Sequence, residues 1–134
     1  MGVVMLLTLT GLIVIGPNAA NAATACNSYS WLYIPRVGDY ILVPSIGYDT
    51  DNVHCVLSVG SENAGVIIMQ SALNRSYNTG LVVDGDFGNR TRAAVLYTQK
   101  VEDISQDGVY GPQTCSHIRW PFINTPNAWS TYDC

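Results

Sequence analysis

Apolar residues recur at helical spacing in three stretches of the second half of the chain. The spacing predicts a first helix from residue 63 or 64 to residue 74, a second over 89–101 and a third over 112–119. The third is short because Pro112 suits the first helical position and Pro121 stops the helix. The residues expected on the buried faces are Val66, Met69, Ala72 and Leu73 in the first helix, Ala94, Val95, Thr98 and Val101 in the second, and Cys115 and Ile118 in the third.

Two aromatic-rich arms flank these helices, over residues 26–55 and 121–134. Proline and glycine interrupt the first arm, which predicts an irregular or short-stranded segment with residues 41–43 as the best strand candidate. Its rings have two interpretations: core filler of a small domain, or an exposed platform on which sugar C–H groups can stack. These rings include Trp31, Tyr33, Tyr40 and Tyr48. The second arm is expected to form an ordered wrap.

A motif of Asp-Gly, any residue, an aromatic residue, Gly, two residues and Thr occurs twice. Each Asp-Gly predicts a tight turn, in which the Asp accepts backbone hydrogen bonds and the Gly adopts a positive φ. Each aromatic ring is expected to enter the core, where its burial contributes about 1.5–3 kcal/mol. The first copy consists of Asp84, Gly85, Phe87, Gly88 and Thr91, and the second of Asp107, Gly108, Tyr110, Gly111 and Thr114.

These copies, with residues 66–70 and Leu73 before the first and Ala94, Val95 and Gln99 between them, resemble the bacterial peptidoglycan-binding domain of the three-helix, type 1 kind. The resemblance covers residues 56–120. It implies a mainly α fold, a small three-helix orthogonal bundle with irregular, aromatic-rich N- and C-terminal arms. The chain departs from the family pattern at Thr98, where a Phe is usual, and at Cys115, where a Trp commonly follows the Thr. The second departure suggests a covalent link in place of a packed ring.

The resemblance implies a secreted, non-catalytic module that binds the glycan strand or the stem peptide of peptidoglycan. The candidates for its ligand face are Gln70, Arg90, Arg92 and Tyr97. The Arg side chains can pair with stem-peptide carboxylates, and Tyr97 can stack on sugar. Alternatively, Gln70 hydrogen-bonds loop backbone and the others form a solvated helix flank. A different function also stays open, that of a secreted effector or inhibitor that binds another protein with the same scaffold.

No catalytic constellation accompanies the motif, so we expect no enzyme activity, cofactor or metal. Asp84 and Asp86 have the spacing that opens a calcium loop, but the twelfth position is Val95 instead of Glu. Neighbouring Cys and His residues at 54–55 and 115–117 could ligate zinc, although an oxidising compartment favours disulfides over such a site.

Residues 1–25 hold no charged residue, and an apolar run precedes a small-x-small triplet at 20–22. This pattern predicts a secretory signal peptide, with a retained membrane segment or a lipoprotein anchor at Cys26 as alternatives. Export favours two disulfides among the four cysteines, with three possible connectivities. We expect the pairs Cys55–Cys115 and Cys26–Cys134.

Composition excludes one class of partner. Of the 134 residues only 12% are charged and the net charge is −4, so a nucleic acid, whose phosphates require basic patches, is not expected to bind. We expect a monomer without a stable membrane anchor, secreted and extracellular or associated with the cell wall.

Overall fold

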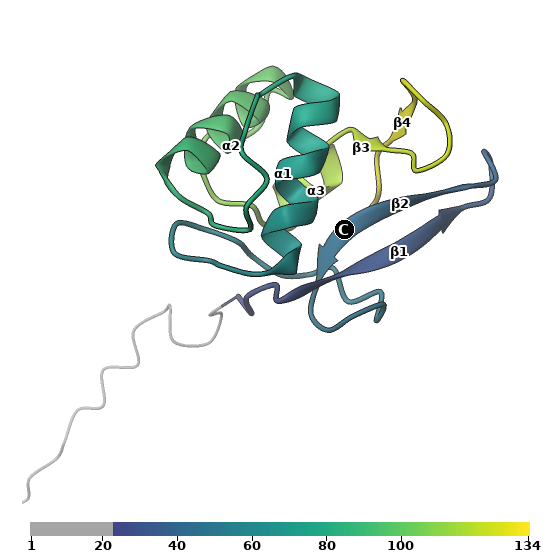
Figure 1. The fold of residues 1–134 in the computed structure, drawn as a ribbon, viewed down its shortest axis with the longest axis horizontal. Coiled ribbons are helices and arrows are strands. Elements are labelled where there is room, and N and C mark those ends of the chain that lie inside the picture. Colours follow the sequence, from purple (N-terminus) through teal and green to yellow (C-terminus); the bar gives the residue numbers. More distant parts are fainter. Residues whose placement is uncertain (1–22) are drawn as a thin grey trace, which may run out of the picture.

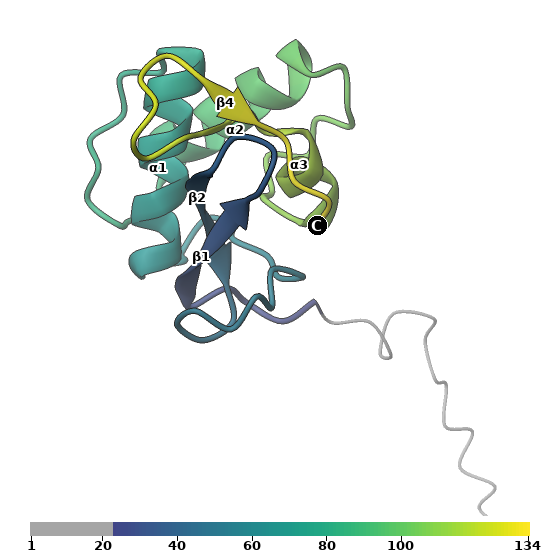
Figure 2. The ribbon, with the colours of Figure 1, turned by 90° about the vertical axis from the view of Figure 1, so that its right-hand side faces the viewer.

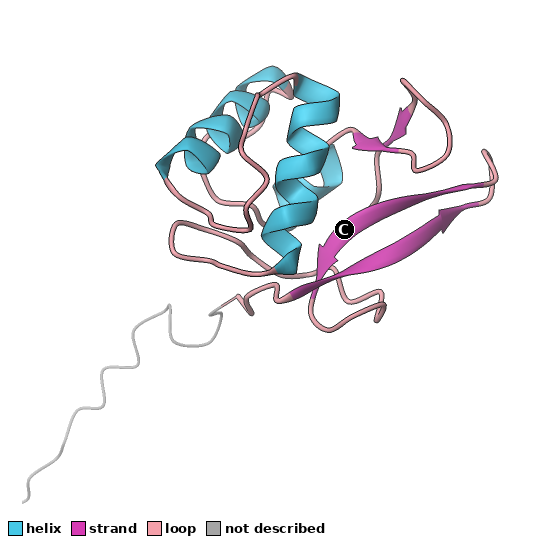
Figure 3. Cartoon of the chain, in the orientation of Figure 1, coloured by secondary structure: helices cyan, strands magenta, loops and turns pink. Residues whose placement is uncertain are grey.

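The computed structural model describes residues 23–134 (Figure 1), so nearly all of the predicted signal peptide, residues 1–25, lies outside the described residues. In the described residues, three helices gather on one side of the molecule and four strands on the other (Figure 3). The helices are α1 (Ala64–Tyr77), α2 (Asn89–Val101) and α3 (Pro112–His117). The strands form two antiparallel pairs, β1 (Ser28–Ile34) with β2 (Asp39–Ser45), and β3 (Trp120–Pro121) with β4 (Trp129–Ser130). Within residues 23–134, none of the helices has the length and apolar character needed to cross a membrane.

The mainly helical fold class is confirmed, and the predicted helices lie close to their observed bounds. Asn63 caps α1, because its Oδ1 accepts hydrogen bonds from the backbone N–H groups of Gly65 (2.9 Å) and Val66 (3.3 Å). The helix continues one turn beyond the predicted end and stops at Asn78, which adopts the left-handed conformation with φ of 53°.

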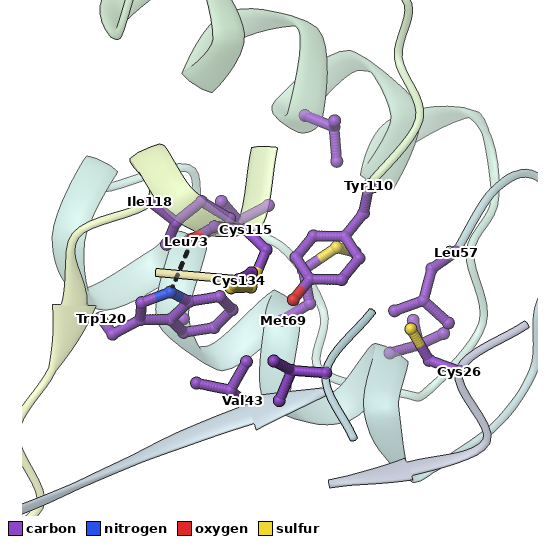
Figure 4. Packing of buried hydrophobic residues seen from close by; sticks show 14 of the residues in the cluster. Cys26, Val43, Leu57, Met69, Leu73, Tyr110, Cys115, Ile118, Trp120 and Cys134 are labelled. Carbon is purple, nitrogen blue, oxygen red and sulfur yellow. Dashed lines mark hydrogen bonds between the residues drawn. A yellow bond between two sulfur atoms is a disulfide. The ribbon is translucent and has the colours of Figure 1, made fainter. Parts of the chain in front are cut away.

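The core lies between the helices and the hairpin β1–β2 (Figure 4), where Val43 of β2 shares one cluster with Met69, Leu73 and Trp120. Every residue predicted for the buried helix faces is buried except Val101, which is 42% exposed. That prediction was wrong because Val101 ends α2 at the edge of its buried face.

The first arm is more regular than the sequence indicated. Residues 41–43 lie in a strand, as predicted, but this strand pairs over seven residues with β1, from Ser28 opposite Ser45 to Ile34 opposite Asp39. Pro35 and Gly38 fall in the turn between the strands, so they shape the hairpin instead of interrupting it. Side chains alternate along the hairpin, with Leu32, Ile41 and Val43 facing the core.

All four cysteines form disulfides, but the predicted pairing was wrong: the bonds join Cys26 to Cys55 and Cys115 to Cys134. The N-terminal residues run beside residues 55–56, where the N–H of Cys26 donates to the carbonyl of Val56 at 2.9 Å. The C-terminus instead returns to α3, where the N–H of Cys134 donates to Ser116 Oγ at 3.1 Å. Each cysteine pairing therefore follows from the place where one arm packs on the rest of the fold. Within residues 23–134, no disulfide joins the two ends of the chain.

Asp39 at the start of β2 links the hairpin to the C-terminal arm, which lies above the hairpin in Figure 2. Its carboxylate accepts hydrogen bonds from the N–H of Tyr40 (2.7 Å), from the N–H and Nδ2 of Asn124 (3.1 and 2.9 Å) and from Thr125 Oγ1 (2.7 Å). The hairpin and the tail thus hold each other through one side chain.

Acidification is expected to loosen this link. Desolvation opposes ionisation of Asp39, but the bonds from Thr125, Tyr40 and Asn124 outweigh it and hold its pKa below the ordinary 3.8. A carboxyl group with a lowered folded pKa stabilises the protein above about 3.8 and loses that contribution as pH falls through the folded value. The protection factor of the Asn124 amide, the exchange rate of an unfolded chain divided by that of the folded protein at the same pH, should therefore fall at acid pH in the wild type, whereas Asp39→Asn should show a lower protection factor already at neutral pH. Equal neutral exchange in both proteins would contradict this role.

Candidate functional site

The first motif copy forms a loop that is held by hydrogen bonds to the side chain of Gln70 in α1. Gln70 Nε2 donates to Asp84 Oδ1 (3.0 Å), to the carbonyl of Asp86 (3.0 Å) and to Thr91 Oγ1 (3.1 Å). Its Oε1 accepts from the N–H groups of Asp84 (3.1 Å) and Gly85 (3.0 Å). Gly85 has φ of 80°, a value that side-chain-bearing residues rarely adopt. The one buried amide group of Gln70 therefore pairs with both N–H donors and oxygen acceptors of the turn.

The second copy repeats this arrangement with Gln99 of α2. Gln99 Nε2 donates to Asp107 Oδ1 (2.8 Å), to the carbonyl of Val109 (3.0 Å) and to Thr114 Oγ1 (3.0 Å), while its Oε1 accepts from the N–H of Gly108 (3.0 Å). As predicted, each motif Asp also accepts from the backbone two residues on, at 3.0 Å from Asp86 and 2.9 Å from Val109. The chain thus uses the same turn twice.

Residues 57–61 connect the two loops. The backbone of Leu57 pairs with that of Tyr110 through two hydrogen bonds of 2.8 and 2.9 Å, and the N–H of Phe87 donates to the carbonyl of Ser61 at 2.9 Å. Both rings are fully buried in one core cluster, as the motif predicts. Trp120 packs edge-on against Tyr110, with ring centroids 6.2 Å apart (Figure 4).

Replacing Tyr110 with Phe is expected to raise the free energy of unfolding by about 1 kcal/mol. Burial raises the pKa of the Tyr110 hydroxyl well above its ordinary value, and within the described residues this hydroxyl has no hydrogen-bond partner. A buried, unpaired hydroxyl costs about 1–3 kcal/mol of desolvation, and the first motif copy already has Phe87 at this position. Urea denaturation measures the change. Tyr97→Phe, on an exposed ring, is the control and should leave the midpoint unchanged; a destabilised Tyr110→Phe would contradict the expectation.

A groove runs along α2 beside the first loop. One part, of about 350 Å³, lies between residues 79–82 and the face of α2 that carries Arg90 and Tyr97. A second part, of about 320 Å³, lies on the loop side and includes Asp84, Asp86 and Asn89. The two parts share Leu81, Val82 and Arg90, and together they form what we call the α2 groove.

Three of the four candidate ligand residues line this groove, but Gln70 is buried in its loop-side part and only the other two are exposed. Arg90 and Tyr97 are exposed along one face of α2 and line it. Arg92 lies about 200° around the helix from Arg90. Its side chain packs over Gly108, with Cγ and Nε each 2.9 Å from where a Cβ there would lie. Gln70 is 1% exposed and its side chain is occupied by the first loop, which is the first of the two roles the sequence left open.

The α2 groove combines apolar walls with charges of both signs. Val82 is 69% exposed at its centre. The pKa of Asp84 is lowered by the backbone N–H of Asp86 and the amide of Gln70, so this carboxylate stays ionised in the loop-side part of the groove. Sequence reasoning missed Leu81, Val82 and Asn89, although an exposed apolar run directly before a polar turn is a visible signal. No cluster of three potential metal ligands occurs in the described part of the chain.

Residues 62–118 match a protein family described as "Putative peptidoglycan binding domain". Two solved structures are also similar. A fused Zn-dependent amidase/peptidase/peptidoglycan-binding domain-containing protein from Clostridium acetobutylicum ATCC 824 is 36% identical over 44% of this chain and 26% of its own, with a TM-score of 0.42. A peptidoglycan-binding protein from Clostridioides difficile, in complex with glutamine hydroxamate, is 27% identical over 64% of this chain and 53% of its own, with a TM-score of 0.48. No curated protein matches the chain.

Proposed function

Since residues 62–118 belong to the peptidoglycan-binding domain family, we propose that this chain is a secreted, non-catalytic module that binds the peptidoglycan of the bacterial cell wall through its α2 groove. Only a binding domain is detected in the chain. The observation that carries the proposal is the groove itself, which places Arg90 and the exposed Tyr97 two turns apart on one face of α2. Within the described residues Arg90 forms no ion pair.

The chemistry of the groove suits a stem peptide lying against a sugar. The guanidinium of Arg90 can hold a stem-peptide carboxylate with two parallel hydrogen bonds. Tyr97 and Val82 offer apolar surface to a peptide side chain or a sugar face. At the opposite end, the ionised Asp84 can accept hydrogen bonds from amide or amino groups. We expect a modest affinity, because the groove is shallow and makes few contacts.

The two disulfides support an exported, cell-wall location, because such bonds persist in oxidising compartments. We propose that the signal peptide is removed by cleavage after Ala22 or nearby, which leaves Thr24 and Ala25 to pair with Val56. The domain of residues 56–120 then folds as a monomer together with the arms at 26–55 and 121–134, whose buried residues share its core.

Arg90→Ala and Tyr97→Ala are each expected to weaken binding to purified insoluble cell wall about five- to tenfold, because each removes a group that contacts ligand. Co-sedimentation of the oxidised protein at low salt, quantified over a range of wall concentrations, measures the loss. Arg92→Ala is the matched control, since it removes the same side chain from the opposite side of the same helix.

Two outcomes would count against this function. Equal sedimentation of Arg90→Ala, Arg92→Ala and the wild type would show that the α2 groove is not the site. No sedimentation of the wild type would exclude wall binding, and recovery of a protein partner by the same protein would then favour the effector or inhibitor function.

A further inference from the structure

The outer face of the hairpin β1–β2 carries a row of aromatic rings that the core does not use. Side chains of odd-numbered β1 residues from Tyr29 to Tyr33 point away from the core, as does Tyr40 of β2. We call this surface the hairpin face; it consists of Tyr29, Trp31, Tyr33, Tyr40 and Tyr48. Tyr33 is 52% exposed and Tyr48 is 62% exposed. The rings therefore form an accessible platform, as the second of the two interpretations of the sequence requires.

The rings of the hairpin face brace one another. Tyr40 lies between Tyr33 and Trp31, with ring centroids at 5.1 Å and 6.3 Å, and Tyr29 meets Tyr48 edge-on at 5.3 Å. Such edge-to-face and tilted contacts fix ring orientation without burying the rings. A ligand that stacks here would meet rings already in place, so little side-chain entropy would be lost on binding.

Exposure of this many rings is costly for a small domain. Burying one such side chain stabilises a fold by about 1.5–3 kcal/mol, and a contiguous exposed apolar patch on a monomer generally marks an interaction site. The inner face of the same two strands is filled by Leu32, Ile41 and Val43, so the core does not need the outer rings. Both faces of the hairpin thus carry apolar side chains. Those of the inner face pack in the core, and the rings of the outer face remain free to contact a ligand.

The charge on the hairpin face matches an uncharged ligand. The rings themselves are uncharged, and the carboxylate of Asp49 borders them, because its Oδ1 accepts from the N–H of Trp31 at 3.2 Å. This carboxylate disfavours an anionic ligand. Sugar rings offer C–H groups to aromatic faces and hydroxyl or amide groups to the phenolic oxygens of tyrosine. Outward residues of one strand are spaced about 6.6 Å apart, so the three rings of β1 extend along the strand on the scale of successive sugars.

We propose that the hairpin face binds an uncharged, 1,4-linked glycan of N-acetylated amino sugars, lying along β1. The platform is argued from the rings, whereas the choice of amino sugars rests on the proposed function. None of the five rings lines the α2 groove, so the two surfaces share no residue. A polymer that engages both surfaces is held by a second, intramolecular contact, which raises apparent affinity without any further interaction.

Titration calorimetry of the oxidised chain with chitohexaose tests the proposal, because this oligosaccharide has the amino-sugar chain without any stem peptide. We expect measurable binding by the wild type and about a tenfold loss in Tyr33→Ala and in Tyr40→Ala. Trp129→Ala is the control, since it removes a ring of similar exposure, 50%, from outside the hairpin face, and it should bind as the wild type does. Circular dichroism establishes that each variant is folded; Tyr33→Phe, which keeps the ring, should retain binding.

The outcomes separate this proposal from the α2 groove. A wild type that sediments with cell wall but does not bind chitohexaose would overturn the glycan platform and leave the proposed function standing. Binding of chitohexaose that is unchanged in both hairpin variants would also overturn it. Equal affinity for cellohexaose would contradict the assignment to amino sugars. Conversely, chitohexaose binding lost in the hairpin variants, with no effect of Arg90→Ala on wall sedimentation, would support the platform while the groove fails.

Discussion

Replacing Gln99 with Leu is expected to lower the free energy of unfolding by about 4 kcal/mol, and replacing Gln70 with Leu by a similar amount. Gln99 is 1% exposed and makes four hydrogen bonds to the second motif loop and to Thr114. Leucine fills nearly the same volume but leaves the buried N–H of Gly108 without its acceptor. Each unpaired buried group costs about 1–3 kcal/mol, so the loss accumulates over the network.

Urea denaturation monitored by tryptophan fluorescence measures this effect. Gln113→Leu is the matched control, because Gln113 is exposed on α3 and its substitution should change the free energy of unfolding by less than about 0.5 kcal/mol. Gln99→Glu keeps the acceptor for Gly108 but replaces the donor to Asp107 with a second carboxylate, so at neutral pH it should also be strongly destabilising through charge repulsion. A cost below about 1 kcal/mol for Gln99→Leu would show that the Asp-Gly turn holds without the amide.

The sequence predicted best what is encoded locally. The bounds of α2 were predicted at both ends, because apolar spacing and the turn at the motif are properties of neighbouring residues. The end of α1 was predicted one turn too early at Asn74. The side chain of Asn74 serves the following loop instead, where its Oδ1 accepts from the N–H of Leu81 at 2.7 Å. A polar residue that caps a loop and one that ends a helix look alike in sequence.

Features that depend on how distant segments of the chain pack together could not be predicted from local sequence patterns. The pairing of Cys26 with Cys55 follows from the path of the N-terminal residues beside residues 55–56, which no local pattern encodes. The position of Arg92 over Gly108 likewise depends on how the second loop folds back on α2. Its separation from Arg90 could have been foreseen, however, because residues two apart on a helix do not face each other.

The two arms lie outside residues 62–118, and each is held by its own disulfide. The bond Cys26–Cys55 encloses the whole hairpin β1–β2, whereas Cys115–Cys134 encloses β3 and β4. Asp39 then joins one arm to the other through Asn124 and Thr125. The arms therefore support each other as well as residues 62–118, and their stability should respond to redox conditions.

Removing either disulfide is expected to lower the free energy of unfolding by about 3 kcal/mol, and removing both by about 6 kcal/mol. The cysteines of each bond lie 29 and 19 residues apart, and a bond across such a loop stabilises mainly by restricting the unfolded chain. The paired variants Cys26→Ala/Cys55→Ala and Cys115→Ala/Cys134→Ala isolate the two contributions, with urea denaturation as the measurement.

Reductant supplies the control for these variants. It should destabilise the wild type by about the sum of the two costs and each paired variant by only the remaining one, because separate loops contribute independently when they share no partner. If the costs of the two paired variants sum to well below the effect of reductant, the two disulfide loops are coupled through Asp39. This residue lies in the Cys26–Cys55 loop, and its carboxylate accepts hydrogen bonds from the Cys115–Cys134 loop.

The α2 groove lies outside both disulfide loops. A folded variant without Cys26–Cys55 should therefore still sediment with cell wall. Loss of sedimentation in such a variant would place part of the wall contact on the hairpin.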